Sequence, residues 1–399
     1  MRVSLCCGKG VLLYIVGILF SYTLADAASP SSSLPDNAAL LYYQACIKRT
    51  HITPPFDFEM TLLGHDPSES VREFVRDAQC REVIELVTLG TKMSDCDWGF
   101  VPSLGWRPDR SIGTSLHRGA QFVAVSARVL AADGQYKSAL NTVLALRRYA
   151  RHLGDETYGM WVMSEGVDGE ALRVVEYLLG VTALNADMLV WLEREFSSST
   201  GPEWHPGETL MNWVDTDGLH AYAVSYARWR ETLLPAMKDD VRRQELQNLT
   251  ETQTLERARR AYRPYIDTAI GILESGIPYE AKDSGIRQLI NEARAKAGEG
   301  DPIALLIDVL DQMEPYYRLH VNYVAHVNAV KAAIAIYRIE ATTGRLPQSL
   351  PPGLPKDPYS GQDFDYHVTE HGFSLSCRTP AIDWSEEDNP RRFVFKVVE

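Results

Sequence analysis

The chain has 399 residues, of which 45% are hydrophobic and 23% are charged. This composition provides enough apolar side chains for a core and excludes a chain that is disordered throughout, and the length predicts two or three domains. The formal net charge of -13 argues against nucleic acid as a partner, because phosphate binding needs clustered Lys and Arg, and it equally disfavours docking on anionic lipid.

The first 27 residues have the pattern of a secretory signal peptide. Arg2 and Lys9 give a positive start, residues 11–24 form a run without charge, and residues 25–27 (ADA) place small side chains where a signal peptidase reads them. An uncleaved anchor is the alternative, because residues 11–28 are just long enough to span a bilayer. Either reading predicts an exported chain (periplasmic, cell-envelope or secreted) that contacts a membrane only through this segment.

Three further regions follow this segment. Residues 28–36 are rich in Ser and Pro and predict a short flexible linker. Residues 37–343 repeat apolar side chains at helical spacing and predict an α-helical hairpin domain. Residues 344–399 break that period and predict a proline-rich loop followed by a small β cap.

Within residues 37–343 the helices are expected in chain order. A helix begins at residue 36 or 37, and another begins with Asp66 as its N-cap and extends through residues 79–93. Two helical runs flank the turn at residues 133–136, which resembles a tetratricopeptide hairpin in a single copy. Later segments are expected as a second hairpin over 156–198, long charged helices over 219–275, a loop over 276–285, two shorter helices over 286–313 and a long helix over 315–342.

The period of the pattern changes after Gly344. Pro347 and the pair at residues 351–352 exclude a helix, and the segment 357–361 (DPYSG) is typical of a turn. Residues 362–368 and 373–376 alternate apolar and polar side chains, which predicts a hairpin, and residues 391–399 can add a third strand. Such a small sheet needs the preceding helix to cover its apolar face. The predicted fold class is therefore mainly α, an irregular helical-hairpin domain with a small C-terminal antiparallel β cap.

Four cysteines follow the signal pattern. An exported protein encounters oxidising conditions, so one disulfide is expected among Cys46, Cys80 and Cys96, which are close in sequence, with the pairing left open. The alternative is that these three and Cys377 are all reduced and packed as small apolar groups.

Several segments together resemble a known group of proteins. Residues 96–99 (CDWG), residues 134–139 and residues 344–366 (GRLPQSL…LPKDPYSGQDFDY) resemble motifs of uncharacterised exported bacterial proteins common in planctomycetes, although Ser360 stands where Thr is usual. The tail alone also resembles the C-terminal cap of G-type pseudopilins of type II secretion. It departs from them because the helix before it is not a membrane-spanning N-terminal helix. The resemblance implies an exported helical protein with a small β cap, and it implies no activity.

Acidic side chains gather near the predicted cap turn. Asp363 and Asp365 lie two positions apart on a predicted strand and so face the same side, with Asp357 nearby. Oxygen clusters suit calcium, and some pseudopilins hold this ion in the corresponding loop. No cofactor is expected, and calcium held by these three residues is the one candidate set against a solvated strand face.

Two other groups of residues are candidate sites. Tyr222, Tyr226 and Trp229 fall on one face of a predicted helix and can form a stacking surface for a ligand, or else part of the core. Glu165 and Asp168 share one helix face and can act as an acid–base pair if they are buried. The sequence holds no nucleophile-elbow, zinc-protease or phosphate-loop motif.

Three functions are therefore considered. The first is an exported cell-envelope binding or scaffold protein without catalytic activity, in which a helical groove holds a protein or peptide partner. The second is a carboxylate-dependent envelope hydrolase that uses Glu165 and Asp168. The third is a component associated with a type II secretion or pilus-like system.

Overall fold

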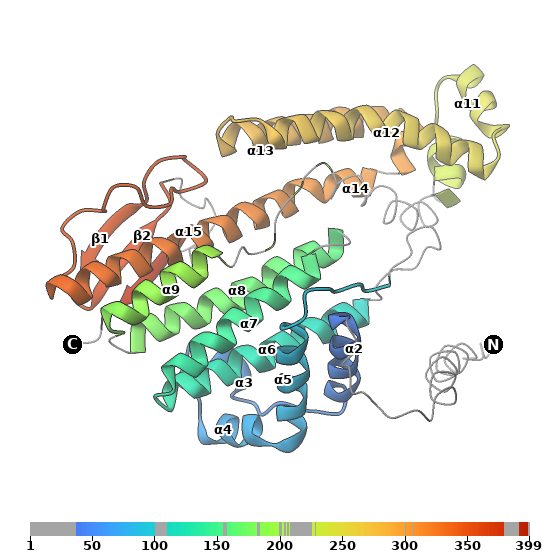
Figure 1. Cartoon of the computed structure of the whole chain (residues 1–399). Helices are drawn as coiled ribbons and strands as arrows, with labels where there is room; N and C mark the ends of the chain where they lie inside the picture. Colours follow the sequence, from blue (N-terminus) through green and yellow to red (C-terminus); the bar gives the residue numbers. More distant parts are fainter. Residues whose placement is uncertain are drawn as a thin grey trace, which may run out of the picture. The chain divides into compact units, whose positions relative to one another are not determined.

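A computed structural model describes residues 37–99, 110–154, 158–181, 184–198, 202, 205, 207, 226–227, 229–299, 301–305, 307–378 and 391–397. These residues belong to one compact unit, Asn37–Glu399. Helices dominate the unit, and a three-stranded antiparallel sheet follows them at the C-terminal end (Figure 1). The predicted fold class, mainly α with a small β cap, is thus confirmed. The predicted signal peptide and linker, residues 1–27 and 28–36, lie outside the described residues.

In the first half of the unit, the elements that the structure describes are helices. Their bounds are α2 (Ala38–Arg49), α3 (Phe58–Leu62), α4 (Glu69–Arg76), α5 (Ala78–Gly90), α6 (Arg110–Ala132), α7 (Tyr136–Gly154), α8 (Tyr158–Val181) and α9 (Ala186–Ser198). The second half adds further helices and the strands. Their bounds are η2 (a π-helix, Trp229–Leu233), α11 (Asp240–Gln247), α12 (Glu251–Glu274), α13 (Tyr279–Gly298), η3 (a 3₁₀-helix, Pro302–Leu305), α14 (Ile307–Asp311), α15 (Met313–Thr343), β1 (Asp365–Thr369), β2 (Gly372–Ser376) and β3 (Arg392–Lys396).

Side-chain caps explain where the early helices start. Asn37 caps α2 as predicted, and its side chain accepts a hydrogen bond from the backbone of Ala39 at 3.0 Å. The prediction of one helix starting at Asp66 and extending past residue 79 is wrong. Ser68 is the N-cap of α4, and Asp77 has extended backbone angles and caps a second helix, α5, through Gln79. A competing cap therefore divides the helix that the apolar pattern alone would continue.

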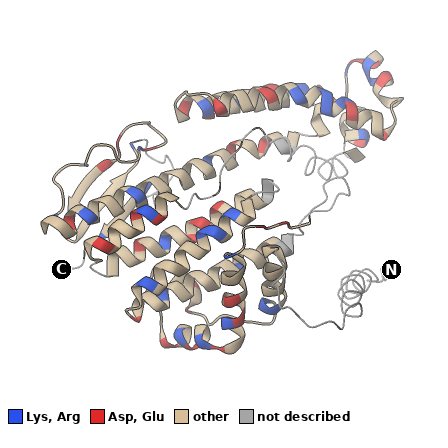
Figure 2. Cartoon of the chain, in the orientation of Figure 1, with Lys and Arg blue, Asp and Glu red and all other residues tan. Residues whose placement is uncertain are grey.

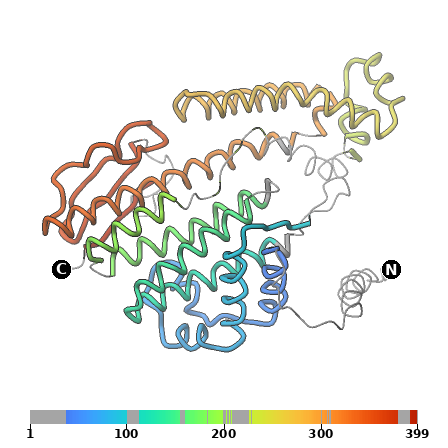
Figure 3. The backbone as a smooth tube through the Cα atoms, in the orientation of Figure 1, coloured from blue at the N-terminus to red at the C-terminus, as the bar shows by residue number. Residues whose placement is uncertain are grey.

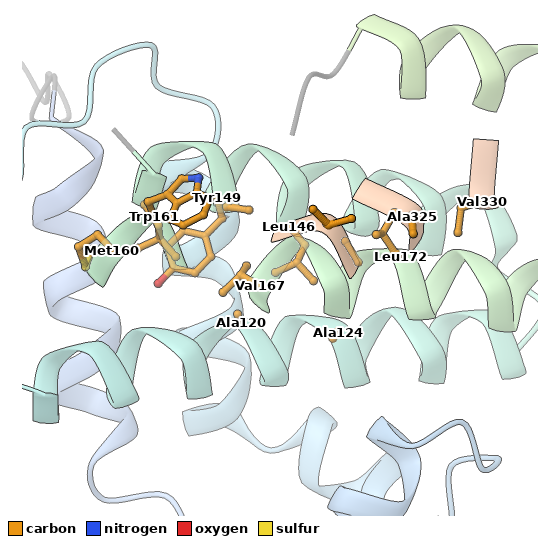
Figure 4. Packing of buried hydrophobic residues seen from close by; sticks show 14 of the residues in the cluster. Ala120, Ala124, Leu146, Tyr149, Met160, Trp161, Val167, Leu172, Ala325 and Val330 are labelled. Carbon is orange, nitrogen blue, oxygen red and sulfur yellow. The ribbon is translucent and has the colours of Figure 1, made fainter. Parts of the chain in front are cut away.

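The main core lies where α6, α7 and α8 pack on one another, with α15 lying along α8 and α9 (Figure 3). Ala120 and Ala124 on α6 and Ala325 on α15 are fully buried, and their small side chains let the helices approach closely (Figure 4). The turn between α6 and α7 contains Gly134 at a positive φ of 74°, as the helix–turn–helix prediction requires. The likeness of this pair to a tetratricopeptide hairpin stays a prediction.

Helices α12 and α13 form a more polar pair. Both carry charged side chains of either sign along their length (Figure 2), as the sequence predicts for the middle of the chain. The predicted loop over 276–285 is wrong from Tyr279 onward, because Pro278 serves as N-cap and α13 starts there. Tyr279 is buried and stacks on Tyr317 of α15, with ring centroids 5.5 Å apart. None of the described helices is both long and apolar enough to cross a bilayer.

The β cap follows the end of α15. Gly344 ends this helix with a left-handed backbone (φ 71°), and the chain then forms the sheet in the order β1-β2-β3 with antiparallel pairing throughout. Phe373, Leu375 and Phe395 are buried on one side of the sheet, and β3 packs on α8 and α15. The cap thus packs on α8 and α15 through β3.

Candidate functional site

The two carboxylates singled out by their helical spacing lie in a buried polar network. Glu165 and Asp168, on α8, are 6% and 0% exposed. Their partners come from other helices: Arg147 from α7, and His320 and Tyr323 from α15. The sequence indicates that the two acids share a helix face, and the structure confirms that this face is turned inward.

Asp168 is held by several donors at once. The guanidinium of Arg147 donates from Nε to Asp168 Oδ1 at 2.9 Å and from Nη2 to Oδ2 at 3.4 Å, and the Tyr323 hydroxyl donates to Oδ2 at 2.7 Å. Arg147 also stacks on the ring of Phe196 at 3.9 Å and donates to its carbonyl oxygen at 3.3 Å. Burial and the Asp168 charge raise the pKa of the Tyr323 phenol, so it stays a donor. Asp168 therefore links α7, α8 and α15 through its hydrogen bonds.

Glu165 has different surroundings. Its Oε1 lies 2.5 Å from Nδ1 of His320, whose ring lies 5.6 Å from the ring of Trp161. Burial raises the pKa of Glu165, and the hydrogen bond and charge of His320 oppose this rise in part. A carboxyl group that retains its proton to a higher pH, next to an imidazole, can exchange a proton with it. The network therefore contains Asp168, held by an arginine and a tyrosine, and Glu165, whose pKa burial raises.

The three predicted calcium ligands do not converge on one point in the structure. Asp357 is fully buried in the turn and accepts hydrogen bonds from the backbone of Tyr359 at 2.9 Å, from the Ser360 hydroxyl at 2.6 Å and from the backbone of Arg378 at 3.0 Å. Asp363 instead pairs with Lys356 at 3.2 Å, and Asp365 pairs with Arg378 at 3.4 Å. Within the described parts of the chain, no group of three His, Cys, Asp or Glu side chains is placed to hold a metal ion. Calcium binding by Asp357, Asp363 and Asp365 stays a prediction.

One residue of the predicted aromatic surface, Trp229, is part of the core. Trp229 is 1% exposed, so its ring offers no free face to a ligand. Tyr226 is half-buried, its ring lies 6.1 Å from that of Trp229, and its hydroxyl accepts a hydrogen bond from Arg230 at 3.0 Å. Tyr222 lies outside the described residues. The structure thus favours the core alternative for Trp229, because its buried ring cannot contact a ligand.

The cysteines are thiols in this structure. Cys80 is buried, Cys46 and Cys96 are half-buried, and no disulfide joins these three described residues. Burial raises the pKa of Cys46 and of Cys80 to about 12, which keeps both thiols protonated and unreactive. Cys46 and Cys96 both lie close enough to Tyr149 to raise the pKa of its phenol, whereas Cys80 lies beside Asp77. A disulfide stays a prediction, and Cys46 and Cys96 are the two cysteines that both lie near Tyr149.

A surface pocket lies outside every segment that the sequence singled out. It has a volume of about 400 Å³ and lies beside the segment that joins α2 to α3. The lining residues are Arg49, Pro54, Pro55, Phe56, Phe58, Glu59, Met60 and Arg118. We call this feature the α2–α3 pocket. The segment HITPPFDFEM predicts only a helix break. It does not predict the pocket, because the fold brings Arg118 to this site from α6.

The walls of the α2–α3 pocket are mainly apolar and unusually accessible. The side chain of Phe56 is 94% exposed and that of Met60 is 42% exposed. Two adjacent prolines precede Phe56 and fix their own φ angles. Large apolar side chains at the rim of a pocket mark a surface that can bind another molecule.

The comparisons with known proteins add no relative. No protein family, no curated protein and no solved structure matches this chain. The function is therefore argued from the chain's own residues.

Proposed function

We propose that this chain is an exported, non-catalytic binding or scaffold protein of the cell envelope, and that it holds a protein partner at the α2–α3 pocket. The observation that carries this proposal is the exposed apolar rim of the pocket, Phe56 and Met60 beside Pro54 and Pro55. Exposed aromatic and methionine side chains are enriched at protein interfaces, where their burial stabilises the complex. Export is supported by the charge and hydropathy pattern of residues 1–27.

The buried network supports a structural role for its acids. Asp168 accepts hydrogen bonds from Arg147 and Tyr323, and these contacts tie three helices together. Donors from two other helices hold this carboxylate in one position. The network therefore supports a rigid helical framework.

The proposal is tested by comparing two variants in capture from envelope extracts of the source cells. Phe56→Ser with Met60→Ser removes the apolar rim, and Val241→Ser, at a side chain that is 81% exposed elsewhere on the chain, is the matched control. We expect a defined protein that the wild type and Val241→Ser retain and that the rim variant loses. Capture of the same proteins by all three would overturn the proposal.

A carboxylate-dependent hydrolase is the second candidate, and one observation favours it. The raised pKa of Glu165 beside His320 is the type of shift that general acids show in enzymes. Hydrolysis of ester, peptide or glycoside substrates that Glu165→Gln abolishes, while its circular dichroism stays unchanged, would support this function over the first. Equal hydrolysis by wild type and variant would exclude it.

A further inference from the structure

The α2–α3 pocket contains two arginines as well as an apolar rim. Arg49 comes from the last turn of α2, and Arg118 comes from α6. Arg118 pairs with Glu59 at 2.5 Å and with the side-chain oxygen of Gln121 at 2.8 Å. The carboxylate of Glu59 is thus already paired with Arg118.

Arg49 differs from Arg118 in its partners. Its Nε atom is buried and makes no hydrogen bond to any described residue. Burial lowers the pKa of Arg49, and the nearby charge of Arg118 lowers it further, so both effects disfavour the cation as it stands. A donor that is buried without an acceptor destabilises the unbound state, and an anion placed here would relieve that penalty.

The apolar wall lines the same pocket as Arg49. Phe56 and Met60 are exposed at the rim, and Pro54 and Pro55 beside them have fixed φ angles. The proline part of the wall therefore loses little backbone entropy when it binds a ligand. The volume of about 400 Å³ lies within the range of small-ligand sites and has room for a few side chains rather than a folded domain.

From this arrangement we infer that the α2–α3 pocket binds a short peptide segment in which a carboxylate side chain lies next to an aromatic or aliphatic one. The carboxylate accepts hydrogen bonds from Arg49 and approaches Arg118, and the apolar neighbour packs on Phe56 and Met60. Arginine suits this task because its planar guanidinium can donate to both oxygens of a carboxylate. The inference rests on the proposed function and adds the chemistry of the bound segment.

Two peptide pairs test this inference. Fluorescently labelled peptides Gly-Ser-Glu-Phe-Gly and Gly-Ser-Phe-Glu-Gly, with blocked termini, are compared with twins that carry Gln in place of Glu. Fluorescence anisotropy with the full chain gives the dissociation constants. We expect at least one Glu peptide to bind about tenfold or more tightly than its Gln twin, because hydrogen bonds to charged groups contribute more than neutral ones. The preference should weaken as salt is raised.

Variants locate the effect at the arginines. Arg49→Gln should remove the preference for Glu over Gln, whereas Arg49→Lys keeps the charge and should retain part of it. Arg260→Gln, at an exposed side chain on α12, is the matched control and should leave the preference unchanged. Circular dichroism establishes that each variant is folded.

Each contrary result has a distinct meaning. Equal binding of the Glu and Gln peptides, no binding of either, or a preference that survives Arg49→Gln would overturn the inference. One of these results can occur while the Phe56→Ser and Met60→Ser variant still fails to capture the protein that the wild type retains. In that case the proposed function stands, and only the carboxylate chemistry is wrong. If the rim variant captures its protein normally, the proposed function itself is wrong.

Discussion

At the scale of single residues, the buried network shows how surroundings give two similar acids different properties. Asp168 and Glu165 lie three positions apart on α8, and both are buried. Asp168 accepts hydrogen bonds from a guanidinium, whereas Glu165 lies beside an imidazole. We therefore expect Asp168 to stabilise the fold through its buried ion pair, and Glu165, whose pKa burial raises, to make stability depend on pH.

Replacing Asp168 with Asn should destabilise the fold strongly. The substitution leaves Arg147 buried without its counter-charge, and breaking a buried ion pair from one side typically costs about 3–5 kcal/mol. Urea unfolding followed by circular dichroism measures the loss. The double variant Arg147→Met with Asp168→Leu removes both charges and should lose less than Asp168→Asn alone. An unfolding free energy for Asp168→Asn within about 1 kcal/mol of wild type would contradict the assigned role.

Glu165 should make the stability of the protein fall as pH rises. Because its pKa is raised in the folded state, the folded chain retains this proton at a pH where the unfolded chain has lost it. The favourable contribution is complete below the unfolded pKa of about 4.3 and is lost as pH rises through the raised folded value. The wild type, measured relative to Glu165→Gln in urea unfolding, should therefore be less stable at pH 7 than at pH 4. A difference that is constant with pH would show that Glu165 is not protonated preferentially in the folded state.

At the scale of elements, local signals predict some boundaries well and fail at others. The helix expected over 315–342 is α15, Met313–Thr343, because Gly344 and Pro347 stop it locally. The local sequence does not predict the start of α13 at Tyr279, because this start depends on packing against Tyr317 and Tyr359 from distant parts of the chain.

The candidate site likewise depends on contacts between residues that are distant in sequence. The spacing of Glu165 and Asp168 was visible, but their partners lie 21 and 155 positions away, and Arg118 reaches the α2–α3 pocket from another helix.

Two glycine substitutions should shift stability in opposite directions. Gly344 ends α15 at φ 71°, so Gly344→Ala should destabilise by about 1–2 kcal/mol, since a side chain disfavours left-handed backbone. Gly271 lies inside α12 with ordinary helical geometry and open space where a side chain would extend, so Gly271→Ala should stabilise by about 0.5–1 kcal/mol. Thermal unfolding of both variants against wild type measures this. Two shifts of the same sign would show that one helix boundary is misplaced.

At the scale of the whole molecule, the β cap lies in the same compact unit as the helices, and hydrogen bonds join it to α15. The Tyr359 hydroxyl donates to the side-chain oxygen of Asn322, and Asn328 donates to the carbonyl oxygen of Lys356 at 2.8 Å. At the other end of α15, Tyr337 donates to the carbonyl oxygen of Lys396. A three-stranded sheet of this size gains most of its stability from the helices it covers. The proline-rich turn at Asp357 therefore serves to dock the cap, and its buried carboxylate holds the turn closed.

A substitution inside the cap should consequently weaken the helices as well. Leu375 is fully buried in β2, so Leu375→Ala should cost about 2–5 kcal/mol of unfolding free energy. If cap and helices unfold together, the midpoint of the helical signal in far-ultraviolet circular dichroism must move to lower urea by the corresponding amount. Val394→Ala, on the exposed side of β3, is the matched control and should change stability by about 0.5 kcal/mol or less. A helical transition that Leu375→Ala leaves in place would mean that residues 344–399 fold as an independent domain, because only then could the cap be lost without loss of the helices it covers.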